Sequence, residues 1–282
     1  MLLTLLALLH SQIGTLPSRR VDIYRLCVGT LVEAIVLPYS MVERVDKKGL
    51  IGLFAYIAYS MQETNEWLID RETLEIKALN FLKLSSDKNK VLTKNVVQIF
   101  TEPIGIIVEQ SPNLFSFIHL NLQEYLAAHY LANWASKACR MNSLEKYLPS
   151  WDWLNIFFLT ACSLDSQEAD EFIEQILNTH LKFDNFFDNL AELKQAELDK
   201  EKVEQILFSL VDLLLAGYCV KEDTFISLSL KSKIQDALVK LWNEMFDIPF
   251  QNIVIADSYI TRDYIIGSLL DLLESPAFNT AS

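Results

Sequence analysis

The hydrophobic and polar positions of this 282-residue chain repeat mostly with the period of an α-helix. Apolar residues at alternating spacings of three and four predict a helix from Pro17 to Val36, which Pro38 breaks or bends at its end. Asp70 is suited to N-cap a later helix, because its carboxylate can accept from backbone N–H groups of the first turn. Further helices are predicted over residues 46–61, 70–84 and 94–101.

One stretch changes to the period of β-strands. Gly105–Glu109 and Leu114–Ile118 are β-branched and aromatic runs on either side of four turn-forming residues, which predicts a hairpin with a four-residue turn. Asn121 is then expected to N-cap a helix over residues 121–136, with Glu124 reaching back to its backbone as in a capping box. A hairpin leading into a helix, preceded by several helices, is the outline of a winged helix.

After Ala135 the pattern predicts helices, and helices of this length can stack in pairs into a solenoid. Residues 185–202 are rich in charge and are either a charged helix or an extended loop. Short strands are predicted at 224–230 and 252–256. The predicted helices cover residues 154–162, 167–177, 203–215, 231–245 and 264–273.

The predicted fold class is therefore mainly α, with a small β-hairpin inside a winged-helix domain and an α-helical, solenoid-like C-terminal domain. The expected domains are a helical segment at 1–45, the winged helix at 46–138 and the C-terminal helices at 139–282.

The composition indicates a large hydrophobic core, and the charged residues are unevenly distributed along the chain. The chain is 51% hydrophobic and has a net charge of −13. Residues 1–140 have 14 Lys and Arg against 13 Asp and Glu, whereas residues 141–282 have 10 against 24. Binding to a nucleic-acid backbone needs clustered Lys and Arg, so the acidic half argues against a nucleic-acid partner.

The sequence also argues against a membrane protein, a disulfide framework and a metal site. The apolar start lacks a basic n-region and is too short to span a bilayer, and Asp212 interrupts the apolar run 206–220. The four cysteines form no C-x-x-C pair, and the four histidines lack the spacing of metal ligands. We therefore expect a soluble, cytoplasmic protein without a metal.

Two segments resemble NACHT-type signalling ATPases of the STAND class. FIHLNLQEYLAA, from Phe117 to Ala128, resembles the end of their winged-helix domain. LLTLLALLHSQIGTLPSRRVDIYRLCVGTL, from Leu2 to Leu31, is similar to the helical segment that follows the nucleotide-binding core in bacterial members. The two motifs stand in the family's order, and the resemblance covers roughly residues 1–136.

The resemblance implies a role for His119, since the histidine at this place in the family contacts the phosphate of bound ADP and helps to hold the closed state. Phe117, Gln123, Glu124 and Tyr125 belong to the same motif and are expected to be structural. Residue chemistry alone favours the simpler interpretation, a strand-end histidine hydrogen-bonded to local backbone.

The catalytic parts of such an ATPase are absent from this sequence. It contains no G-x-x-x-x-G-K-[ST] phosphate loop and no Walker B carboxylate, and only 7 glycines. We therefore expect no enzyme activity from this chain alone, and ATP or ADP as a ligand only if an NTPase core is joined to it. It would then be the C-terminal part of a longer or split protein.

The leading function hypothesis is a non-catalytic regulatory module that couples ligand sensing to nucleotide-dependent switching and oligomerisation, in antiviral defence or signal transduction. Its expected partners are proteins: the NTPase core, in cis or in trans, and further copies of itself. A winged-helix nucleic-acid-binding regulator is an alternative, although residues 121–136 contain no Lys or Arg. A vestigial fragment is another. A hydrolase using His119 lacks an ordered triad or a G-x-S-x-G elbow.

Overall fold

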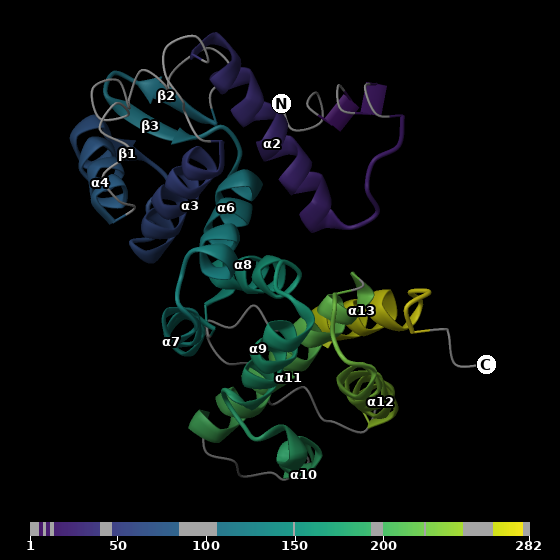
Figure 1. The fold of residues 1–282 in the computed structure, drawn as a ribbon. Helices are drawn as coiled ribbons and strands as arrows, with labels where there is room; N and C mark the ends of the chain where they lie inside the picture. Colours follow the sequence, from purple (N-terminus) through teal and green to yellow (C-terminus); the bar gives the residue numbers. More distant parts are fainter. Residues whose placement is uncertain are drawn as a thin grey trace. The chain divides into compact units, whose positions relative to one another are not determined.

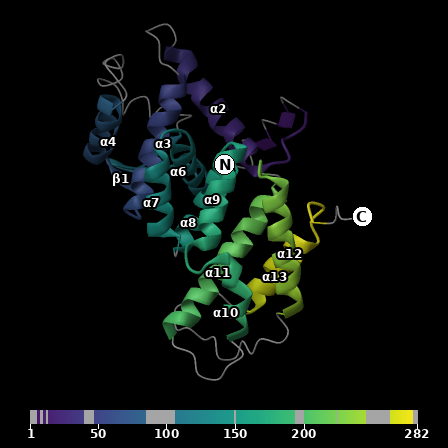
Figure 2. The same cartoon turned by 60° about the horizontal axis from the view of Figure 1, so that its bottom comes forward.

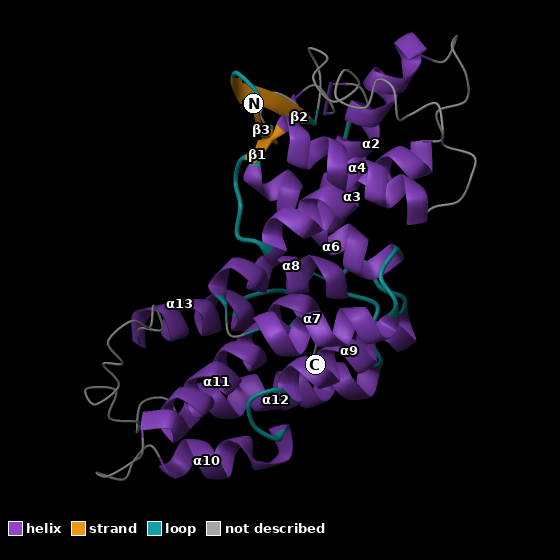
Figure 3. Cartoon of the chain, turned by 90° about the vertical axis from the view of Figure 1, so that its left-hand side faces the viewer, coloured by secondary structure: helices purple, strands orange, loops and turns teal. Residues whose placement is uncertain are grey.

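The structure is a computed structural model. It describes residues 6–7, 10–11, 14–39, 47–84, 106–148, 150–192, 200–222, 224–244 and 262–278. The chain divides into two compact units, residues 1–136 and residues 137–282. Figure 1 shows that both are mainly helical, and Figure 3 shows that the strands belong to the first unit. The predicted fold class, mainly α with a small β-hairpin, is confirmed.

The core of the first unit is a pair of helices. α3 (Lys47–Glu63) packs most extensively against α6 (Leu120–Asn133). α2 (Arg20–Tyr39) packs against both. The apolar residues of these helices recur every three or four positions, so each helix turns one stripe toward the core. The buried residues of α3 and α6 include Leu50, Leu53, Phe54, Ile57, Met61, Leu122, Tyr125, Leu126 and Leu131.

Beside these helices lies a three-stranded antiparallel sheet in the order β1-β3-β2 (Figure 3). β3 (Leu114–Phe117) is central, with β1 (Ile69–Asp70) on one side and β2 (Ile107–Ser111) on the other. The β2–β3 turn contains two residues, Pro112 and Asn113, and not the predicted four. Asn113 has φ 64°, a left-handed conformation that asparagine tolerates better than most residues, which allows the shorter turn.

The short strand β1 leads directly into α4 (Arg71–Leu84). The carboxylate of Asp70 accepts from the backbone N–H of Thr73 at 2.9 Å and from its hydroxyl at 2.7 Å. This is the N-cap predicted from the sequence. β1 itself was not predicted, since two residues show no periodicity and become a strand only by pairing with β3.

The second unit consists of helices around one central helix, α11 (Lys200–Lys221). α11 contacts five other described helices, of which α9 and α12 lie beside it in Figures 1 and 2. The acidic half of the chain is thus organised around a hub and not as the successive helix pairs of the expected solenoid. The helices of this unit are α7 (Lys137–Tyr147), α8 (Trp151–Ala161), α9 (Ser166–Asn178), the 3₁₀ helix η3 (Phe183–Asn185), α10 (Phe186–Glu192), α11, α12 (Leu228–Glu244) and α13 (Arg262–Leu273).

Several local predictions need correction. The strand predicted at 224–230 is wrong: the chain there is a loop that ends in α12. The hydroxyl of Ser227 accepts from the backbone N–H of Leu230 at 3.3 Å, so this serine starts the helix. Residues 186–192 and 200–202 are helical. The predictions at 94–101 and 252–256 lie outside the described residues.

One described helix, α11, is long and apolar enough to cross a membrane by length and composition. However, 72% of its apolar window is buried within the fold, as in the core helix of a soluble protein. The packing therefore supports solubility, and location in the cytoplasm stays a prediction.

Candidate functional site

The candidate site lies where the hairpin passes into α6. Phe117, the last residue of β3, is 5% exposed and anchors the strand end in the core. The backbone N–H of Ile118 donates to the carbonyl of Ile106 at 2.9 Å, which extends the pairing beyond the strand. His119 follows in an extended conformation, with φ −155° and ψ 136°, and α6 begins at Leu120. The fold thus fixes the backbone of His119 from both sides.

His119 is the N-cap of α6. Its Nδ1 accepts from the backbone N–H of Asn121 at 3.2 Å, and its carbonyl accepts from the N–H of Leu122 at 3.0 Å. An Nδ1 that accepts a hydrogen bond has no proton, so the neutral ring has its proton on Nε2. The imidazole therefore caps the helix with one nitrogen and can donate with the other.

The prediction that Asn121 is the N-cap of this helix was wrong. It lies inside the helix, and its backbone N–H goes to His119 Nδ1, so the predicted capping box between Asn121 and Glu124 is not formed. Histidine was overlooked because Ser, Thr, Asp and Asn are the usual caps.

The remaining residues of the motif are mostly buried. Gln123 and Tyr125 are 3% and 2% exposed, and Glu124 is half-buried. Burial raises the pKa of Tyr125 to about 12, although Arg25 beside it acts in the opposite direction. Gln123 and Tyr125 therefore face the core of the first unit.

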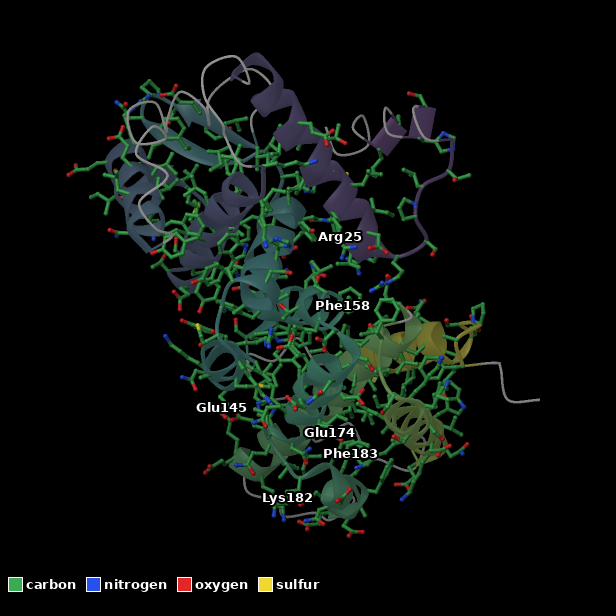
Figure 4. All side chains as sticks on the ribbon, in the orientation of Figure 1. Arg25, Glu145, Phe158, Glu174, Lys182 and Phe183 are labelled. Carbon is green, nitrogen blue, oxygen red and sulfur yellow. The ribbon has the colours of Figure 1, made fainter. Side chains whose placement is uncertain are left out.

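α2 brings further polar side chains to the start of α6. The hydroxyl of Tyr24 accepts from the Asn121 side-chain amide at 3.0 Å, and the Tyr24 ring lies 5.8 Å from that of Tyr125. Arg25, the next residue, hydrogen-bonds to Asp22, and its charge acts to lower the pKa of Tyr125 against the larger effect of burial; it is labelled on α2 in Figure 4. The sequence analysis did not place these α2 residues beside the start of α6, because the spacing of apolar residues shows which face of a helix is buried but not which other helix packs against it.

His129, nearly three turns further along α6 than His119, is the second histidine of the region. Burial, and the Arg25 charge to a smaller extent, lower the pKa of His129 to about 4, so it is neutral at pH 7. Its Nδ1 lies 3.2 Å from the side-chain amide of Asn133, which suits an accepting nitrogen. The structure thus gives His129 a packed, uncharged role within the helix, which agrees with its lack of metal-ligand spacing.

A shallow cavity of about 330 Å³ opens beside α2, at the start of α3. Its walls hold two acidic and two basic residues, and Lys47 pairs with Glu33 across it. His119 does not line this cavity. The lining residues are Pro17, Asp22, Arg25, Leu26, Gly29, Thr30, Glu33 and Lys47.

The second unit contains a buried acid–histidine pair that the sequence did not indicate. His180 Nδ1 lies 2.7 Å from Asp212 Oδ2, and the His180 ring stacks on Phe208 at 5.1 Å. Asp212 is 1% exposed, and this burial raises its pKa to about 6 although His180 opposes the shift. The only sign in the sequence was a single acid within the apolar run of α11.

Within the described part of the chain, no group of three or more potential ligands could hold a metal ion. The reduced thiols of Cys27, Cys162 and Cys219 are buried, and that of Cys139 is half-buried. No family model, curated protein or solved structure matches the chain. Function is therefore inferred from the residues around His119.

Proposed function

We propose that this chain is a non-catalytic regulatory module of a NACHT-type STAND NTPase, in which His119 senses the phosphate of bound ADP. The observation that supports this proposal best is the position of His119: it caps α6 through Nδ1, and this leaves Nε2–H as a donor. The sequence motif around it, from Phe117 to Ala128, is one of the two segments that resemble the family.

The chemistry at this position suits a phosphate. A neutral imidazole donates one hydrogen bond to a phosphate oxygen, and an anion near a helix N-terminus is favoured by the helix dipole. α6 has 14 residues and therefore a full dipole at its start. Because the extended backbone and the Asn121 hydrogen bond hold the ring, His119 would meet a phosphate without being ordered first.

The proposal gives the two units different tasks. The first unit would contact the nucleotide-binding core and transmit the state of its nucleotide. The second unit, acidic and helical, would act as the sensor or scaffold that binds a protein partner or further copies of the chain. The NTPase core would lie in the same polypeptide or in a separate one, and it would supply the site for ATP and ADP.

The first experiment asks which core the chain works with. The intact mass of the endogenous protein, together with the proteins that co-purify with it, would identify a P-loop polypeptide in cis or in trans. A protein that begins at Met1 and binds no P-loop protein would contradict the proposal.

The second experiment measures release of fluorescent ADP from the complete assembly. His119→Ala removes a hydrogen bond to a charged group, typically about 1.5–3 kcal/mol, so ADP should dissociate roughly 10 to 100 times faster. His119→Ser separates the two roles of the residue, since serine caps a helix but cannot reach a phosphate. The exposed His10 serves as the control, and His10→Ala should leave release unchanged.

In His119→Ser the helix should remain as stable as in the natural protein while ADP release is as fast as in His119→Ala. ADP release that is unchanged in both variants would remove His119 from the mechanism and leave it only the role of a cap.

A further inference from the structure

We propose that Tyr24 is a positioning residue for His119, acting through Asn121, so that the place of α2 on α6 sets the orientation of the imidazole. The structural part of this inference stands on the contacts alone. Its consequence for nucleotide release rests on the proposed function of His119.

Three hydrogen-bonding groups form a continuous path from α2 to the imidazole. The Asn121 side-chain amide donates to the Tyr24 hydroxyl at 3.0 Å, and the Asn121 backbone N–H donates to His119 Nδ1 at 3.2 Å. One residue therefore has both contacts, its side chain toward α2 and its backbone toward His119. A displacement of Asn121 must change the second hydrogen bond as well as the first.

Tyr24 is itself held in place. Its side chain is 7% exposed, and its ring packs 5.8 Å from that of Tyr125, one turn further along α6 than Asn121. Tyr24 thus contacts two successive turns of α6, through its hydroxyl at Asn121 and through its ring at Tyr125. A tyrosine with a fixed ring offers its hydroxyl in one place, which makes it a geometric reference for Asn121.

The path has a directional consequence. While α2 is packed on α6, the backbone N–H of Asn121 donates to His119 Nδ1, and the Nε2–H of the imidazole is oriented to donate to a ligand. If α2 shifts by the length of a hydrogen bond, Asn121 loses its side-chain partner, the cap weakens and the ring can rotate. Tyr24 would thus couple movement of α2 to the group that donates to phosphate.

The test uses the full chain without nucleotide. Tyr24→Phe and Asn121→Ala each remove the first hydrogen bond, and loss of a neutral hydrogen bond should make the backbone N–H at position 121 exchange with solvent roughly fivefold faster. Asn121→Asp should restore protection, because the Tyr24 hydroxyl can donate to the new carboxylate. Tyr59→Phe is the matched control, since it removes a tyrosine hydroxyl of the same unit whose partner, at 2.9 Å, is Glu63.

Long-range ¹H–¹⁵N spectra of histidine-labelled protein give the second readout. The Nδ1 resonance of His119 should move in Tyr24→Phe and Asn121→Ala and return in Asn121→Asp, while His129 stays unchanged. Mere loosening of the helix would instead raise exchange along all of α6 and would not be repaired by the aspartate.

The outcomes separate the two proposals. Exchange and Nδ1 resonance that stay at natural values in Tyr24→Phe and Asn121→Ala would overturn the positioning role of Tyr24, whatever ADP does. The expected changes together with faster ADP release from the assembly would support both proposals. The same changes with unaltered ADP release would keep Tyr24 as the positioning residue and refute phosphate sensing by His119.

Discussion

Gly52 on α3 lies close against the indole of Trp134, and this contact leads to a sharp prediction. A Cβ built on Gly52 would lie 2.3 Å from Cζ2 of Trp134 and 2.5 Å from its Cε2. Carbon atoms pack best at about 3.5–4.0 Å, so Gly52→Ala would push the indole away by more than about 1 Å. Phe81 lies edge-on at 5.3 Å on the ring, which limits the space for that movement.

Two effects oppose each other in Gly52→Ala. Alanine in a helix interior is more favourable than glycine by about 1 kcal/mol. Overpacking a well-filled core typically costs about 1–3 kcal/mol. Because the obstacle is a rigid ring and not the far end of a flexible side chain, we expect the clash to prevail and the first unit to lose about 1–2 kcal/mol.

Gly29, on α2 of the same unit, provides the control. A Cβ there would meet only Lys47 Nζ, at 3.9 Å, so Gly29→Ala should keep the propensity gain and stabilise the unit by about 0.5–1 kcal/mol. Hydrogen exchange of α3 and α6 amides in increasing urea measures both variants within the first unit alone. Trp134→Leu, which removes the ring, should abolish most of the difference between alanine and glycine at position 52.

A clash with Trp134 is refuted if Gly52→Ala is as stable as Gly29→Ala, or if the effect of the alanine persists unchanged in the Trp134→Leu background. Either result would mean that the indole yields at little cost and that α3 and α6 do not depend on this close approach.

Two further predictions concern charge. The pKa of His129 falls from 6.5 to about 4 on folding, so between pH 4 and 6.5 the unfolded chain binds more protons than the folded one. The free energy of unfolding of the first unit should therefore decrease by up to about 3 kcal/mol as the pH falls from 6.5 to 4. The pKa of Asp212 rises to about 6, so the second unit should instead become more stable as the pH falls from 6 to 4; amide exchange of the two units measured at pH 7 and 4.5 tests the opposite signs. Asp70→Ala should lower the melting temperature of the first unit because it removes the cap of α4, whereas Asp70→Asn, which retains a side-chain acceptor, should lower it less; equal effects would show that the cap is unimportant.

The elements with a clear apolar period could be predicted from the sequence. α3, α4, α6 and α11 each bury residues three and four positions apart, and that pattern depends on the helix alone. α7 was missed because it is polar: Arg140, Ser143 and Leu144 are its buried residues, and Arg140 pairs with Glu168 on α9 at 2.7 Å. Its position depends on partners that lie far away in the sequence.

The candidate site was predicted in part. The motif pointed to His119, and the strand-to-helix junction around it could be read from the change of period. The N-cap was placed two residues too late, and the contribution of α2 was invisible. Tyr24 and Asn121 are separated by 97 positions, and a hydrogen bond over that distance follows from tertiary packing and not from any local pattern.

The hub arrangement around α11 has a consequence for the synthesis of the protein. α12 and α13, which follow α11 in the chain, both contact it. While the ribosome is still making them, the apolar helix that resembles a membrane span is incompletely covered. The second unit must therefore finish folding late, after residues 262–273 have emerged, whereas the first unit already has all its helices and can fold ahead of it. During that interval the side of α11 that α12 and α13 cover in the finished unit is exposed, and it is the segment most able to associate with other apolar surfaces.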